Sequence, residues 1–103
     1  MKDLYQIGLG PKRFVSAELR PYHKGWMITR ISEPDNAPKA EGLDLKILNM
    51  VIIDADNEGV ILYLGESIVS RRGAKRYVHL GFQVYSGTPR RRPVYQEKGD
   101  SYV

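Results

Sequence analysis

The sequence predicts a small all-β domain, built as a meander that closes into a barrel or stacks as a sandwich. Apolar and polar residues alternate with a period of two in most segments, and no window shows the 3.6-residue apolar stripe of an amphipathic helix. Turn signals rich in glycine, proline and aspartate separate the alternating runs. The chain has 103 residues, which is enough for one modest core. We expect a single β-rich domain of five to six antiparallel strands over residues 1–87 and a flexible basic tail over residues 88–103.

The N-terminal part predicts a short strand or arm and then a hairpin. Residues 4–11, "LYQIGLGP", alternate and stop at a Gly-Pro breaker. Residues 12–32 hold two alternating runs around a turn at Tyr22–Gly25. We expect shared faces for Val15, Ala17 and Leu19 in the first run and for Met27, Thr29 and Ile31 in the second. The proline-rich stretch 33–42 is expected to be a loop.

The middle of the chain predicts the most buried strand. Residues 43–55 are apolar on both faces between Ile47 and Ile53, which favours a central strand covered on two sides. The following "DNEG" has the residue types of a tight turn. It leads into an expected strand at residues 60–67.

The last predicted hairpin has its tip at "RRGAK", residues 71–75, and its return strand at residues 76–85. Alternation assigns Val78, Leu80, Phe82 and Val84 to the core. The opposite face then carries aromatic and cationic side chains beside a glycine gap, which suits base stacking and phosphate contact. The candidate binding residues on this hairpin are Arg71, Arg72, Lys75, Arg76, Tyr77, His79 and Tyr85. The alternative is that the rings are half covered by a neighbouring sheet or by the tail.

Positive charge is concentrated in the same region. Residues 67–96 hold seven of the sixteen Lys and Arg and no Asp or Glu, whereas the other 73 residues hold nine cations and twelve anions. A one-signed patch attracts phosphate backbones or acidic proteins. In the tail, Arg90, Arg91 and Arg92 lie between two prolines, and we expect them to reach along a nucleic-acid backbone or into a minor groove. The alternative is a tail that only improves solubility.

The segment "KRFVSAELRPYHKGWMITRIS", residues 12–32, resembles the opening hairpin of the purine-rich-element-binding repeats. The resemblance covers about a fifth of the chain and implies single-strand binding through a curved sheet. In that family a long amphipathic helix follows, and here the proline-rich loop stands in its place.

A second resemblance concerns "PDNAPKAEGLDLK", which is similar to the motif of the PD-(D/E)xK nucleases. It implies Asp35 and Asp44 as metal ligands and Lys46 as the catalytic cation. The alternative is that the two carboxylates lie on the surface of a loop and a strand start. The helix-flanked core that this resemblance implies is not visible in the pattern, so no catalytic residue is assigned.

Other sites are excluded by residue type. The absence of cysteine removes disulfides, thiolate metal sites and cysteine nucleophiles. "DADNEGVILYLG" begins like a calcium loop but has Gly65 where a bidentate glutamate is required. We expect no metal, no cofactor, no membrane span and a cytoplasmic protein that is not an enzyme.

Binding to single-stranded DNA or RNA is the predicted function, because no recognition helix is apparent. The alternative is a protein-interaction or assembly module that docks a partner on exposed strand edges or binds an acidic protein. A homodimer is compatible with both interpretations.

Overall fold

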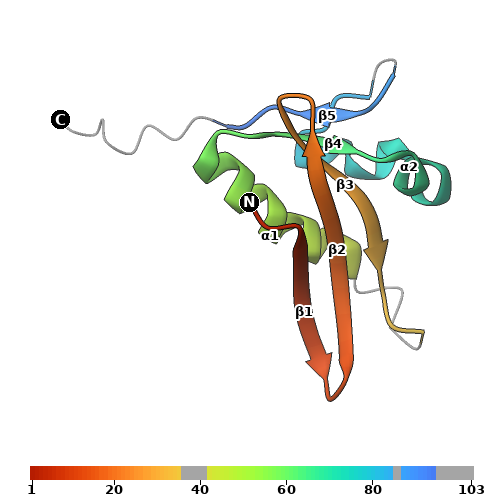
Figure 1. The fold of residues 1–103 in the computed structure, drawn as a ribbon. Helices are drawn as coiled ribbons and strands as arrows, with labels where there is room; N and C mark the ends of the chain where they lie inside the picture. Colours follow the sequence, from red (N-terminus) through yellow and green to blue (C-terminus); the bar gives the residue numbers. More distant parts are fainter. Residues whose placement is uncertain (36–41, 85–86, 95–103) are drawn as a thin grey trace.

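The computed structural model describes residues 1–35, 42–84 and 87–94. One mixed sheet has the strand order β1-β2-β3-β4-β5 and does not close into a barrel (Figure 1). The prediction of an all-β fold is therefore wrong, although the sheet itself is confirmed. The strands are β1 (Leu4–Gly10), β2 (Arg13–Tyr22), β3 (Gly25–Ser32), β4 (Ile61–Leu64) and β5 (Arg90–Arg91), and the helices are α1 (Leu43–Glu58), α2 (Glu66–Arg72) and the 3-10 helix η2 (Ala74–Leu80).

The first three strands form an antiparallel meander, which confirms the predicted strand and hairpin. A bulge in β3 alters the expected faces, because Leu19 pairs with Ile28 whereas Glu18 pairs with Arg30. Thr29 is therefore the extra residue, and the alternation shifts by one position across it. As a result Ile28 and Ile31 face the core, and the prediction that Met27, Thr29 and Ile31 share a face is wrong.

Residues 43–58 form the helix α1 instead of the predicted buried strand. Its buried residues recur at helical spacing, and they are Leu43, Asp44, Ile47, Leu48, Val51, Ile52 and Ala55. Two exposed apolar side chains on the opposite face, Met50 and Ile53, made the segment look apolar all round. The predicted turn at 56–59 is the end of this helix, where Gly59 adopts a left-handed φ of 69°. A long helix thus follows the first hairpin after all.

The helix α1 connects two parallel strands. It follows β3, packs on one face of the sheet and leads into β4, which pairs with β3 from Gly25↔Ile61 to Ile28↔Leu64 (Figure 1). A parallel pair needs a crossover of this kind, which a meander of hairpins cannot provide. The core lies between α1 and this face of the sheet. In the part of the chain that the structure describes, no helix is long and apolar enough to cross a bilayer.

The predicted basic hairpin over residues 68–85 is wrong. The chain forms α2, turns at Gly73 and continues as η2 to Leu80. Tyr77 and Phe82 enter the core, whereas Val78 is exposed, so the expected inward and outward faces are partly exchanged. Glycines at 65, 73 and 81 separate the short elements, and Gly73 and Gly81 have positive φ values of 86° and 102°.

The sheet continues past the expected domain end at residue 87. In β5, Arg90 pairs with Tyr63 and Arg91 pairs with Leu62 of β4, so residues 87–94 are not a detached tail. Residues 95–103 of the predicted tail lie outside the described residues.

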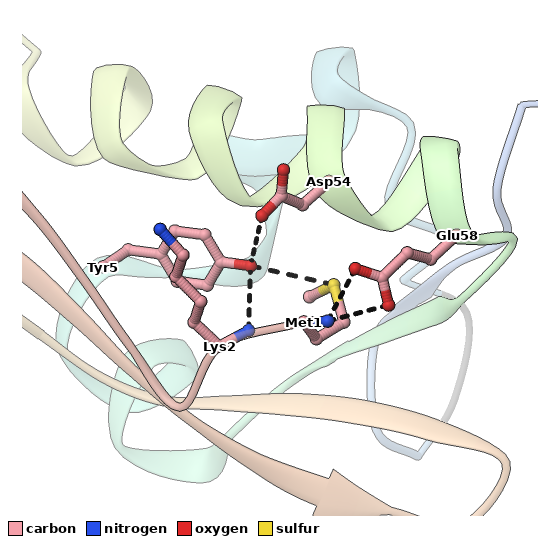
Figure 2. Close-up of polar contacts among 5 residues, drawn as sticks. All are labelled: Met1, Lys2, Tyr5, Asp54 and Glu58. Carbon is pink, nitrogen blue, oxygen red and sulfur yellow. Dashed lines mark hydrogen bonds and ion pairs between the residues drawn. The ribbon is translucent and has the colours of Figure 1, made fainter.

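At the N-terminus, polar contacts join the β1 end of the sheet to α1 (Figure 2). The hydroxyl of Tyr5 donates to Asp54 at 2.8 Å, and the amino group of Met1 lies 2.6 Å from the carboxylate of Glu58. Burial raises the pKa of Tyr5 to about 12, and the carboxylate of Asp54 contributes while the backbone N–H of Lys2 opposes the shift. The helix α1 is thus held against one face of the sheet, whereas Glu66 and Val69 of α2 and residues 87–89 lie beside Arg20 and Met27 on the opposite face.

Candidate nucleic-acid interface

Two of the candidate arginines surround a buried carboxylate at the start of α1. Asp44 is fully buried and accepts two hydrogen bonds from Arg76, at 2.6 and 2.7 Å. The hydroxyl of Tyr77 donates to the same carboxylate at 2.7 Å, and Arg72 lies 3.5 Å from it. Arg72 also lies 3.8 Å from Glu33. Asp44 and, at longer range, Glu33 therefore offset part of the positive charge of these two arginines.

The environment of Asp44 keeps it ionised. Burial alone would raise its pKa, but hydrogen bonds from Arg76 and Tyr77 and the charges of Arg76 and Arg72 lower the pKa to about 2. Burial and the neighbouring carboxylate raise the pKa of Tyr77 above its usual range, so its hydroxyl remains a donor. Tyr77 is inaccessible to solvent, and the prediction that it is an exposed stacking platform is wrong.

The nuclease-like residues do not converge on one site. Asp35 and Lys46 are exposed, whereas the carboxylate of Asp44 already accepts hydrogen bonds from a guanidinium and a phenol. Within residues 1–35, 42–84 and 87–94, no group of three or more His, Asp or Glu side chains is placed to hold a metal ion. The geometry therefore gives no support to a metal site built on Asp44.

Arg91 is also an internal residue, contrary to the prediction that it reaches a nucleic acid. Its guanidinium contacts both carboxylate oxygens of Asp56, at 2.7 and 3.2 Å, and donates to the carbonyl of Leu80 at 2.7 Å. The backbone N–H of Val94 donates to the same carboxylate of Asp56. Burial opposes ionisation of Asp56, but the hydrogen bonds from Arg91 and Val94 lower its pKa. Arg91 thus fixes the C-terminal segment to α1.

The remaining candidates are distributed over the surface. Arg71, Lys75, His79, Arg90 and Arg92 are exposed, and Tyr85 lies outside the described residues. Arg71, Arg72 and Arg76 line an open hollow of about 300 Å³ that also contains Asp44 and Glu33, which we call the arginine hollow. Arg90 lies on a different part of the molecule. The structure therefore does not gather the predicted residues into one site.

A row of side chains crosses the face of the sheet opposite α1. Cross-strand pairing places Arg20 beside Met27, Met27 beside Tyr63 and Tyr63 beside Arg90. Neighbours in register point to the same face, so two arginines lie at the ends of the row. The separation of Arg20 on β2 from Arg90 on β5 spans three interstrand spacings, roughly 14 Å.

Beside this row lies an open hollow of about 560 Å³, which we call the aromatic hollow. Three rings meet in it: the Tyr22 ring lies edge-on to His23, with centroids 4.3 Å apart, and to Tyr63, with centroids 5.0 Å apart. Its other described lining residues are Lys24, Gln83, Thr88 and Arg90, and none of the described lining residues is a carboxylate.

Sequence reasoning found Arg90 of this hollow but missed its rings. The sequence predicts Tyr22 and His23 in a turn and Tyr63 in a strand, and it indicates no binding role for them. The available signal was alternation, which places Tyr22 on the face of β2 opposite Val15, Ala17 and Leu19. The pairing of β3 with β4 across α1 brings Tyr63 beside them, and that pairing is not visible in a local window.

Comparison of the chain with protein-family models, with curated proteins and with solved structures finds no match.

Proposed function

We propose that this chain binds single-stranded nucleic acid on the sheet face opposite α1. The observation that carries the proposal is the aromatic hollow, which is lined by three aromatic rings and by two cationic side chains, Lys24 and Arg90. Aromatic rings that stack with bases and cations that contact phosphates are the two components of single-strand recognition.

The charges on this face favour an anionic polymer. Arg20, Arg30 and Arg90 extend from this face on three different strands, and Lys24 adds a fourth cation at the β2–β3 turn. The carboxylates of Glu18 and Glu66 reduce the net positive charge at the β2 and α2 sides. Arg20 and Arg90 are exposed at the two ends of the row, whereas Met27 and Tyr63 between them are buried. A strand would therefore contact the cations at the ends and the aromatic hollow beside the row.

A single strand fits this surface better than a duplex. The exposed face of α1 includes Glu58, Asn49 and Ile53, which is not the basic face of a helix that enters a major groove. Unpaired bases, in contrast, present flat surfaces that a sheet and its turns can contact.

Fluorescence anisotropy with labelled single-stranded DNA, single-stranded RNA and duplex DNA tests the proposal. We expect the single strands to bind more tightly than the duplex and log K to fall with log salt by about 0.7 for each phosphate contacted. Arg20→Ala and Arg90→Ala should each reduce this slope, whereas Lys46→Ala, an exposed lysine on α1, serves as the matched control. Absence of binding at low salt, or equal effects of all three variants, would refute the proposal.

A phosphate-bearing small ligand is a second candidate, favoured by the arginine hollow. In open sheets, ligands bind beyond the carboxyl ends of parallel strands. Glu33 follows the end of β3, and Arg71 and Arg72 lie in α2 after the end of β4. Arg72 is held by two longer ion pairs, at 3.5 and 3.8 Å, so its donors can turn to a phosphate. Calorimetric titration with ADP and inorganic pyrophosphate would detect such a site, and Arg72→Ala should abolish the heat while Arg90→Ala leaves it unchanged.

A further inference from the structure

We infer that the aromatic hollow holds a single unpaired nucleobase together with its adjoining phosphate. This inference rests on the proposed function and makes it specific: one base position would contribute most of the base-dependent affinity, while the rest of the strand contacts the sheet through its phosphates. The hollow has the size of ordinary small-ligand sites.

The ring geometry leaves aromatic surface available to a base. Tyr63 is almost completely buried and forms the base of the cluster, Tyr22 is half-buried against it, and His23 is exposed. His23 has a left-handed φ of 49°, which places this side chain at the tip of the β2–β3 turn. In each of the two edge-to-face contacts of Tyr22, one ring covers a face of the other with its edge, and the ring faces that point away from these contacts are not covered by them.

Backbone pairing fixes two polar side chains on the other side of the hollow. Gln83 and Arg90 exchange both backbone hydrogen bonds, at 2.7 and 3.2 Å, so their side chains emerge on the same face. The side-chain amide of Gln83 can both donate to and accept from a base edge. The guanidinium of Arg90 can contact the adjoining phosphate.

The burial of Arg91 determines where Arg90 points. Arg91 is held on the α1 face by Asp56, and successive residues of a strand point to opposite faces. Arg90 must therefore emerge on the face with the hollow. A shift of one residue in β5 would bury Arg90 and separate Arg91 from Asp56. The ion pair between Arg91 and Asp56 therefore helps to fix the register of β5 against β4.

The charge around the hollow favours a nucleotide over a neutral aromatic ligand. Lys24 and Arg90 are two separate cations among its lining residues, and the described lining includes no carboxylate to compete with a phosphate. A flat ring with an attached anion satisfies both the aromatic and the cationic side chains.

Pentanucleotide analogues separate this inference from the proposed function. The first probe has five abasic sugar–phosphate units, the second has one base at its centre, and the third has bases at all five positions. We expect the central base to raise affinity roughly 5- to 150-fold over the abasic probe, which corresponds to one stacking contribution of about 1–3 kcal/mol. The four further bases should add less than the first.

Variants then locate the base. Tyr22→Ala and His23→Asn should remove most of the affinity that the central base adds and leave the affinity for the abasic probe unchanged. Asparagine is chosen at position 23 because it tolerates the left-handed backbone of His23. Phe14→Ala is the matched control, because Phe14 is exposed in β2 and is not among the lining residues. Retention of the gain in both hollow variants would overturn the inference.

The abasic probe distinguishes the two failures. If it binds as tightly as the five-base probe, the base site is refuted while phosphate binding on this face remains. If none of the probes binds at low salt, the proposed function fails and the inference fails with it.

Discussion

Replacement of Asp44 by asparagine tests the buried network around α1. The side chain keeps its shape and loses its charge, so Arg76 and Tyr77 would face a neutral amide. The carboxyl pKa falls from 3.8 to about 2 in the folded protein, and at 1.36 kcal/mol per unit this represents about 2 kcal/mol of folding free energy. Loss of one partner of a fully buried pair costs about 3–5 kcal/mol, but Arg76 is partly exposed and can be hydrated. We expect Asp44→Asn to lower the free energy of unfolding by about 2–3 kcal/mol at pH 7.

The same variant makes a prediction about pH. Because the folded-state pKa of Asp44 is below its unfolded value, its stabilisation is complete above pH 4 and is lost as the pH falls through 2. The stability difference between wild type and Asp44→Asn should therefore shrink over this interval.

Urea unfolding followed by circular dichroism measures both effects. At pH 7 the expected change corresponds to a shift in Tm of roughly 10 °C or more for a chain of this size. Asp35→Asn is the control, since Asp35 is exposed, and it should change stability by less than about 0.5 kcal/mol. If Asp44→Asn is as stable as this control, or if its deficit persists unchanged at pH 2, the assigned role of the carboxylate is refuted.

Three further variants test other contacts by urea unfolding. In Gly25→Ala the new Cβ would overlap the carbonyl oxygen of Ile61, so we expect a loss of about 3 kcal/mol. In Gly8→Ala the new Cβ would make only an ordinary contact with the Phe14 ring, at 3.9 Å, and stability should be unchanged to within about 1 kcal/mol. Asp56→Asn should cost about 3 kcal/mol at pH 7 because it leaves the buried Arg91 unpaired, and the deficit should decrease in acid as the wild-type carboxylate is protonated. Tyr5→Phe should lower the free energy of unfolding by about 1 kcal/mol, because it removes the hydrogen bond to Asp54. The phenol of Tyr5 has a raised pKa in the folded protein and stabilises the fold only while the phenol is protonated, so the difference should disappear as the pH rises from 10 through 12. An unchanged difference at high pH would contradict the assignment.

The β1–β3 meander was predictable because its signals are local. Alternation of Val15, Ala17 and Leu19 and the turn before Gly25 specify a hairpin without reference to the rest of the chain. The bulge at Thr29 was not predictable. The residues before and after Thr29 have side chains that are compatible with either face of the sheet, so the sequence does not show where the extra residue lies.

The helix α1 was misassigned although the sequence held two signals for it. The segment between Gly42 and Gly59 is 16 residues long, which exceeds the usual strand, and its buried positions repeat at helical spacing. Met50 and Ile53 hid that spacing because they are apolar and exposed. The length of the segment distinguishes a helix from a strand where apolar residues occur on both faces.

Composition identifies the basic region, but it does not reveal which of its arginines form ion pairs inside the protein. Arg72, Arg76 and Arg91 contact Asp44 or Asp56, which are contributed by α1 from far earlier in the chain. A window of sequence counts cations that tertiary contacts later compensate. The buried Tyr77 was misread for the same reason, since its hydrogen-bond acceptor lies 33 residues away.

The accessible cationic surface therefore differs from the one that the linear charge distribution suggests. Carboxylates of α1 neutralise part of the basic region, while Arg20, Lys24 and Arg30 come from the N-terminal part of the chain, outside the acid-free stretch 67–96. These residues reach one face only because β2 and β3 pair with each other and β3 pairs with β4. Arg90 belongs to both descriptions: composition identifies it, and the burial of its neighbour Arg91 directs it to the aromatic hollow. Arg90 is thus the candidate on which sequence and geometry agree, and its substitution is the most direct test of the face.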